Sequence, residues 1–154
     1  MTMLKVENLH KIFRTEEIET IALNGVTFDV NEGEFVAIMG PSGCGKSTLL
    51  NILGLLDNPT SGRYQLLGRE VSTLREKERT RFRKGNIGFV FQSFNLIPTL
   101  SVVENVALPL TYRGIPTAKR LERSLSALEA VRLSSRLSHK PYELSGGQQQ
   151  RVAI

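Results

Sequence analysis

The sequence has few of the residues that form covalent crosslinks or metal centres. A single cysteine, Cys44, excludes an internal disulfide framework and a thiolate metal cluster. The two histidines, His10 and His139, lie far apart in the chain, which argues against a zinc site. We therefore expect both histidines to be structural residues.

Long apolar runs are also lacking. The longest nearly apolar stretch, residues 49–56, is interrupted by Asn51 and Gly54 and is far shorter than the roughly 20 residues that cross a bilayer. The first residues contain no long apolar segment and include an acid at Glu7, so no secretory signal is predicted. Hydrophobic residues make up 40% and charged residues 23% of the 154 positions, which is ordinary globular composition. The sequence thus predicts a soluble, intracellular, single domain.

The net charge of +5 suggests an anionic partner: a nucleotide, a nucleic acid or a membrane surface. Residues 69–84 hold most of the clustered basic side chains, but three glutamates are interleaved with them. Glu76 and Glu78 each precede an arginine by three residues, the spacing of a solvated helix face. There is no unbroken basic run and no aromatic interleaving, so no nucleic-acid partner is expected.

The hydrophobic pattern predicts an α/β fold. Strands are expected at residues 3–13, 26–30 and 63–67. Two continuous apolar runs, residues 35–39 and 87–91, are typical of strands in the middle of a covered parallel sheet. Helices are expected at residues 47–56, 74–84, 102–108 and 117–131. Ser101 is expected to cap the third helix, and Ala118, Leu121, Leu125 and Leu128 to form the apolar face of the fourth.

A glycine-rich loop follows the first of these apolar runs. It matches the pattern G-x-x-x-x-G-K-[ST] with Gly40, Pro41, Ser42, Gly43, Cys44, Gly45, Lys46 and Ser47. Such glycines let backbone N–H groups surround phosphate oxygens, and the helix that follows presents its positive end to the same anion. Lys46 can reach the β- and γ-phosphates, the Ser47 hydroxyl can ligate Mg²⁺, and Thr48 can reach a nearby phosphate oxygen. We interpret Cys44 as a small filler at a variable position of the motif.

A second glycine motif carries a resemblance to a known family. It consists of Leu144, Ser145, Gly146, Gly147 and Gln148, about 100 residues after the phosphate loop. The pair of motifs resembles the phosphate loop and signature of ABC-type ATPases, and the resemblance spans the whole chain. Phe13 resembles the aromatic residue that stacks on adenine, with an ordinary core or strand residue as the alternative. Gln92 resembles the Q-loop glutamine that ligates Mg²⁺ and senses the attacking water, with a polar strand end as the alternative.

Residues 94–98, 104–110 and 148–154 are similar to one subgroup, which powers lipoprotein release from the inner membrane, macrolide export and antimicrobial-peptide export. The resemblance implies a P-loop NTPase fold with a parallel core sheet and an N-terminal antiparallel β subdomain in residues 1–92. A helical subdomain with the signature follows in residues 93–154. It also implies an ATP-binding exporter subunit in which Lys46, Gln92 and Ser145 are catalytic.

The same resemblance implies the partners. Two copies pair head to tail, and each MgATP is held between the phosphate loop of one copy and Ser145, Gly146 and Gly147 of the other. A permease docks on residues 92–100 and holds the subunit at the cytoplasmic face of the cell membrane. A simple helix cap is the alternative for the signature, and a local core patch is the alternative for residues 94–99.

Part of the family's catalytic set has no match in these residues. The family implies an apolar strand ending in Asp-Glu after the signature, and then a histidine that contacts the γ-phosphate. Asp57 follows two leucines but lies eleven residues after Lys46, roughly 16 Å along a helix, and Asn58 stands where Glu is needed. We expect the chain to be the front part of such a domain, with an incomplete central sheet. The alternative function is a nucleotide-binding fragment or module without sustained hydrolysis.

Overall fold

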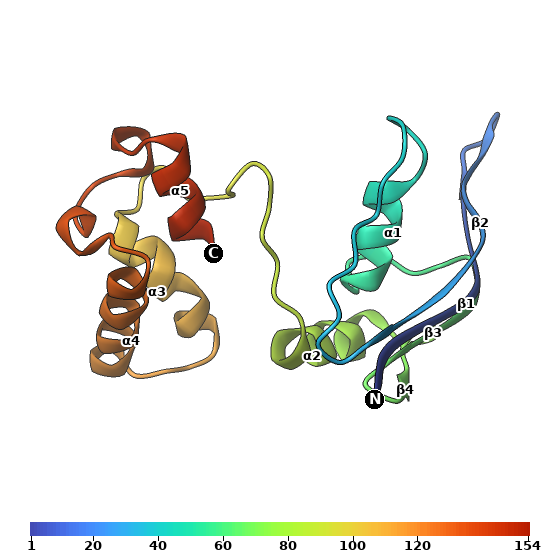
Figure 1. The fold of residues 1–154 in the computed structure, drawn as a ribbon, viewed down its shortest axis with the longest axis horizontal. Coiled ribbons are helices and arrows are strands. Elements are labelled where there is room, and N and C mark those ends of the chain that lie inside the picture. The colour runs from blue at the N-terminus through green and yellow to red at the C-terminus, as the bar shows by residue number, and fades with distance from the viewer. The chain divides into compact units, whose positions relative to one another are not determined.

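A computed structural model describes residues 1–154, in which the chain folds as two units, Met1–Ile87 and Gly88–Ile154 (Figure 1). Each unit has a hydrophobic core of its own. The sequence predicts the boundary between the β subdomain and the helical subdomain five residues later, between residues 92 and 93. The phosphate loop therefore belongs to the first unit and the signature to the second.

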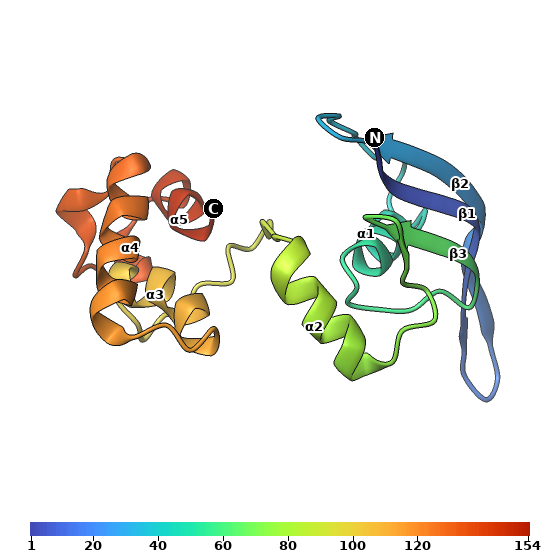
Figure 2. The same ribbon diagram turned by 90° about the horizontal axis from the view of Figure 1, so that it is seen from below.

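The first unit is built on an antiparallel sheet with the strand order β2-β1-β3-β4. Its strands are β1 (Thr2–Arg14), β2 (Glu19–Asn31), β3 (Ser61–Leu66) and β4 (Arg69–Glu70). Two helices, α1 (Lys46–Leu53) and α2 (Glu76–Asn86), lie on the same side of this sheet (Figures 1 and 2). The predicted strands and helices of this unit are thus confirmed, except for the strand at residues 35–39 and with β2 longer than expected.

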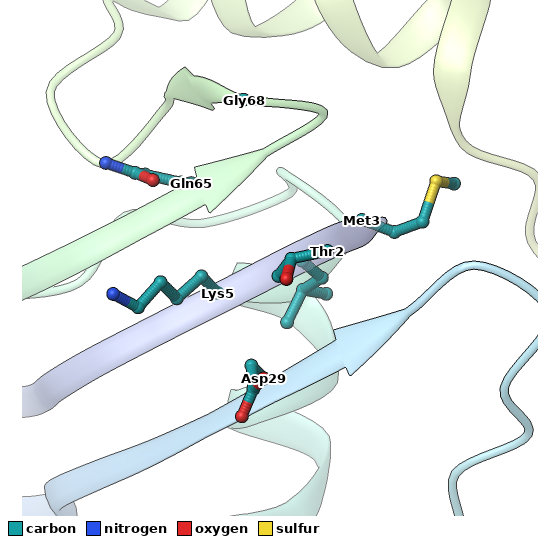
Figure 3. Close-up of a pocket in the computed structure, with 7 residues that line it drawn as sticks. Thr2, Met3, Lys5, Asp29, Gln65 and Gly68 are labelled. Carbon is teal, nitrogen blue, oxygen red and sulfur yellow. The ribbon is translucent and has the colours of Figure 1, made fainter.

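Successive side chains along each strand point to opposite faces of the sheet, so one face is buried and the other is exposed. Val6 and Tyr64 are fully buried and pack with Ile52 of α1. The Tyr64 hydroxyl donates a hydrogen bond to the carbonyl of Leu53 at 2.7 Å, which attaches the end of α1 to the sheet. On the other face, Lys5, Asp29 and Gln65 lie side by side on three neighbouring strands and line a shallow hollow (Figure 3).

The second unit is helical. It contains α3 (Val102–Tyr112), α4 (Thr117–Ala130), two short 3-10 helices (Ser134–Arg136 and Pro141–Glu143) and α5 (Gly146–Ala153). Ser101 caps α3 as predicted: its hydroxyl accepts a hydrogen bond from the Glu104 amide, and the Glu104 carboxylate accepts one from the Ser101 amide at 2.6 Å. No helix of either unit is both long and apolar enough to span a bilayer.

The two strands predicted from continuous apolar runs are not formed. Residues 35–39 and 87–91 have no strand assignment, and Phe35 and Met39 are almost fully exposed. A strand that is apolar on both faces is stabilised only where other strands pair with it and helices cover it. No other segment of the described chain pairs with these residues, so the parallel core sheet expected from the sequence is not formed in this structure.

The prediction for the fourth helix is only partly right. Leu128 is buried as expected, but Leu121 and Leu125 remain 50% and 38% exposed. The fully buried neighbour of Leu128 is Ser124, whose hydroxyl donates to the carbonyl of Arg120 at 2.7 Å. This hydrogen bond within the helix lets a polar side chain occupy a core position.

Candidate functional site

The phosphate loop leads directly into α1. Gly43 and Gly45 have φ values of +81° and +90°, a region that residues with a side chain rarely adopt. Gly45 is the N-cap of α1 and provides no side-chain hydrogen bond to the helix. Because the first amides of a helix have no partner within it, the start of α1 offers donors to an anion.

The loop lies directly against β2. A Cβ atom built on Gly45 would be only 2.3 Å from the carbonyl oxygen of Ala22, so only glycine allows this approach. A Cβ atom on Gly40 would be 2.7 Å from the Cys44 sulfur, so the thiol occupies the space beside Gly40. Cys44 itself is exposed, and its interpretation as a small filler stays a prediction.

Lys46 points back onto the loop. Its Nζ atom donates hydrogen bonds to the carbonyl oxygens of Gly40 and Pro41, at 2.8 and 2.6 Å. The first turn of α1 also carries the hydroxyls of Ser47 and Thr48. Glycine backbone, an ammonium group and hydroxyls at a helix start are together suited to a polyphosphate, and hydroxyl oxygen is a ligand type that Mg²⁺ accepts.

Phe13 belongs to the same unit as this loop. It lies near the end of β1, is 47% exposed, and pairs with Thr20 of β2. Thr20 is two residues from Ala22, roughly 7 Å along the strand from the point where Gly45 touches β2. The structure therefore brings Phe13 and the phosphate loop to the same end of the β1–β2 hairpin, and its exposure rules out a core role.

Sequence reasoning missed the residue beside Phe13. Lys11 Nζ forms an ion pair with Asp57 at 2.8 Å, donates a hydrogen bond to the carbonyl of Asn58 at 2.7 Å, and lies over the Phe13 ring at 5.0 Å. The only signal in the sequence is the i, i+2 spacing of Lys11 and Phe13, which places both on one face of a strand. Asp57, which the sequence predicts to lie away from the phosphates, is thus the partner of Lys11.

The Lys11–Asp57 pair makes stability depend on pH. Burial acts to raise the pKa of the Asp57 carboxyl, but hydrogen bonds from Lys11 and from the Asn58 amide outweigh burial, so this pKa lies below its ordinary value of 3.8. A lowered folded-state pKa contributes stability that is present above the unfolded value and lost as the pH falls through the folded one. We expect Asp57→Asn to destabilise the first unit at neutral pH, and the difference from the parent to shrink below pH 3.8. Urea unfolding of the parent and of Asp57→Asn, from neutral pH to below pH 3.8, measures this stability difference. If the difference is the same at all pH values, the ion pair does not lower the pKa of Asp57.

The remaining predicted residues lie in the second unit. Gln92 is exposed, in the segment that precedes α3. Ser145 is the N-cap of α5: its hydroxyl accepts from the Gln148 amide at 3.4 Å, and the Gln148 side chain accepts from the Ser145 amide at 2.9 Å. Gly146 and Gly147 form the exposed first turn, so the signature does cap a helix while its first amides stay without intrahelical partners.

Comparison with known proteins decides the family. A family profile described as ABC transporter matches residues 23–154. The chain belongs to the ABC transporter family. Over 99% of its length it is 52% identical to the macrolide export ATP-binding/permease protein MacB of Brucella melitensis and 51% identical to an uncharacterized ABC transporter ATP-binding protein of Thermotoga maritima.

Solved structures of ABC cassettes share the fold. A dimeric structure of the ATP-binding cassette MJ0796 in a post-hydrolysis state, bound to ADP and Pi, superimposes with a TM-score of 0.87 at 46% identity over 98% of this chain. The chain spans 67% of that cassette, 65% of the Thermotoga relative and 24% of the Brucella relative. The α/β ABC cassette fold predicted from the two motifs is confirmed.

Proposed function

We propose that this chain is the ATP-binding part of an ABC-type exporter of the lipoprotein-release and macrolide-export subgroup. The observation that carries the proposal is the phosphate loop itself. Gly45 lies against β2 at the start of α1, and the carbonyl oxygens of Gly40 and Pro41 hold the Lys46 ammonium. The 52% identity to a protein named as a macrolide export ATP-binding/permease protein supports the subgroup.

Each site residue then has a role. The backbone N–H groups of Gly40 and of residues 42–48, together with the Lys46 ammonium, bind the β- and γ-phosphates, whereas Pro41 has no N–H to donate. Phe13 stacks on the adenine. The Ser47 hydroxyl and the Gln92 side-chain oxygen would hold Mg²⁺, whose positive charge neutralises the phosphates when it is bound. By the same resemblance, Gln92 also senses the attacking water. Lys46 moves from its two carbonyl partners to phosphate oxygens, exchanging neutral acceptors for charged ones.

The signature indicates a second copy. Its serine and glycines form an exposed helix start in one unit, whereas the phosphate loop lies in the other. Two copies that pair head to tail place the signature of each on the nucleotide of the other, and the dimeric MJ0796 structures support this arrangement. In this proposal a permease docks on residues 92–100 and holds the subunit at the inner face of the membrane. The relatives named ATP-binding/permease proteins support a permease as the partner.

Lys46→Ala tests nucleotide binding. We expect about tenfold to hundredfold weaker MgATP binding, because a charge-assisted hydrogen bond contributes about 1.5–3 kcal/mol. Isothermal titration calorimetry measures the affinity, and a thermal unfolding curve without nucleotide checks that the variant folds. Lys77→Ala, which removes an exposed lysine of α2, is the control for charge alone. If Lys46→Ala binds MgATP as tightly as the parent, the phosphate-loop assignment is wrong.

A nucleotide-binding module without sustained hydrolysis is the second candidate. The observation that favours it is the placement of the two aspartates: Asp57 is paired with Lys11, and Asp29 lies on the outer face of the sheet beside Lys5 (Figure 3). Steady-state phosphate release distinguishes the two candidates. Sustained release that Lys46→Ala abolishes would exclude the second.

A further inference from the structure

One ammonium group connects Phe13 to the segment that follows α1. Lys11 is only 13% exposed, and its Nζ atom contacts the Asp57 carboxylate, the Asn58 carbonyl and the Phe13 ring. The ion pair and the hydrogen bond hold the ammonium in place over one face of the ring. A cation over an aromatic face is attracted by the ring quadrupole, so the ring is fixed in return.

The other end of this ion pair leads to the phosphate loop. Asp57 lies four residues after Leu53, where α1 ends, and α1 begins at Lys46. The end of α1 is itself attached to the sheet by the hydrogen bond from Tyr64 to Leu53. The Lys11–Asp57 pair therefore links the strand that carries Phe13 to the helix that starts at the phosphates.

We propose that Lys11, held by Asp57, is a positioning residue that fixes the Phe13 ring as a platform for the nucleotide base. This inference rests on the proposed function and extends it to two residues outside both glycine motifs. With Lys11 over one face, the half-exposed ring offers its remaining surface to a base. A platform that is already ordered before binding loses little conformational entropy when the base arrives.

The chemistry of the contact sets its specificity. Stacking on a ring uses the π-face that every base has, and not the hydrogen-bonding edge that differs between adenine and guanine. Loss of Lys11 should therefore weaken ATP and GTP alike. Inorganic tripolyphosphate, which has no base, should bind as before, because Lys11 does not touch the phosphate loop.

Lys11→Gln tests the proposal in calorimetric titrations of the purified chain with ATP, GTP and tripolyphosphate, each with Mg²⁺. We expect about threefold to tenfold weaker ATP and GTP binding and unchanged tripolyphosphate binding, from the usual strength of a partly buried cation–π contact. Lys11→Arg should restore the affinity, because a guanidinium keeps the positive charge over the ring. The matched control is Lys5→Gln, which removes another lysine of β1 that pairs with Glu7 at 2.6 Å, and it should change none of the three affinities.

The outcomes separate the possible failures. Equally weakened binding of all three ligands would show that Lys11 supports the unit as a whole. Unchanged binding of all three would show that the Phe13 ring needs no support from Lys11. Either result overturns the proposal. If Lys11→Gln leaves Asp57 unpaired and the chain fails to fold, Lys11→Met combined with Asp57→Asn removes both charges and is read in the same way. If Lys46→Ala leaves ATP and tripolyphosphate binding intact, it is the proposed function that fails.

Discussion

Gly62→Ala is expected to destabilise the first unit by about 3–5 kcal/mol, at the upper end of what single substitutions cost. Gly62 lies at the start of β3, where its φ of +97° would itself cost a residue with a side chain about 1–2 kcal/mol. A Cβ atom there would be 2.3 Å from the carbonyl oxygen of Asn8 and 2.7 Å from the Cα atom of Leu9. Both are backbone atoms of β1, so the strain cannot be relieved by turning a side chain.

The position matters because β1 is irregular at the same point. Its pairing with β2 shifts between Val6 and Leu9, its pairing with β3 shifts between Glu7 and His10, and Asn8 has a φ of +47°. β3 can pack against this irregular part of β1 only because residue 62 has no Cβ atom to collide with the β1 backbone. Gly68→Ala is the matched control, because Gly68 has a φ of +73° but open space around it, and it should cost only about 1–2 kcal/mol. Urea unfolding of both variants measures the difference, and equal losses would show that close approach to β1 is unimportant.

Local patterns predicted the elements whose determinants lie close together in sequence. The serine cap of α3 and the start of α4 at residue 117 depend on residues within one helical turn. The phosphate loop and signature could likewise be found, because each is a contiguous motif. The ABC family followed from these two motifs alone.

The remaining features depend on contacts between distant residues. The runs at residues 35–39 and 87–91 have the composition of buried strands, but strand formation requires partners that local composition does not supply. Lys11 and Asp57 are 46 positions apart, and neither belongs to a motif, so only the folded chain shows that they pair. Sequence spacing thus identified the two glycine motifs and left unidentified the ion pair beside Phe13.

Gly45→Ala is expected to damage both stability and nucleotide binding. Its Cβ atom would lie 2.3 Å from the Ala22 carbonyl oxygen and 3.1 Å from a methyl carbon of Leu23, at a φ of +90°. The contact can be relieved only if the loop moves away from β2, and that movement displaces the start of α1. We expect unfolding free energy to fall by about 3–5 kcal/mol, and MgATP affinity to fall more than about a hundredfold, because a helix start that moves no longer matches the phosphates.

Gly33→Ala distinguishes this close approach from backbone strain. Gly33 has a φ of +80°, nearly that of Gly45, but no atom lies within 4 Å of its Cβ position, and it stands outside the phosphate loop. We expect it to cost about 1–2 kcal/mol of unfolding free energy and to leave MgATP affinity unchanged. Urea unfolding and calorimetry on both variants give the comparison. If Gly45→Ala retains MgATP affinity within about threefold, less than 1 kcal/mol, contact with β2 does not hold the loop in its binding conformation. If it loses affinity while Gly33→Ala does not, the hairpin that carries Phe13 also determines where the phosphates bind.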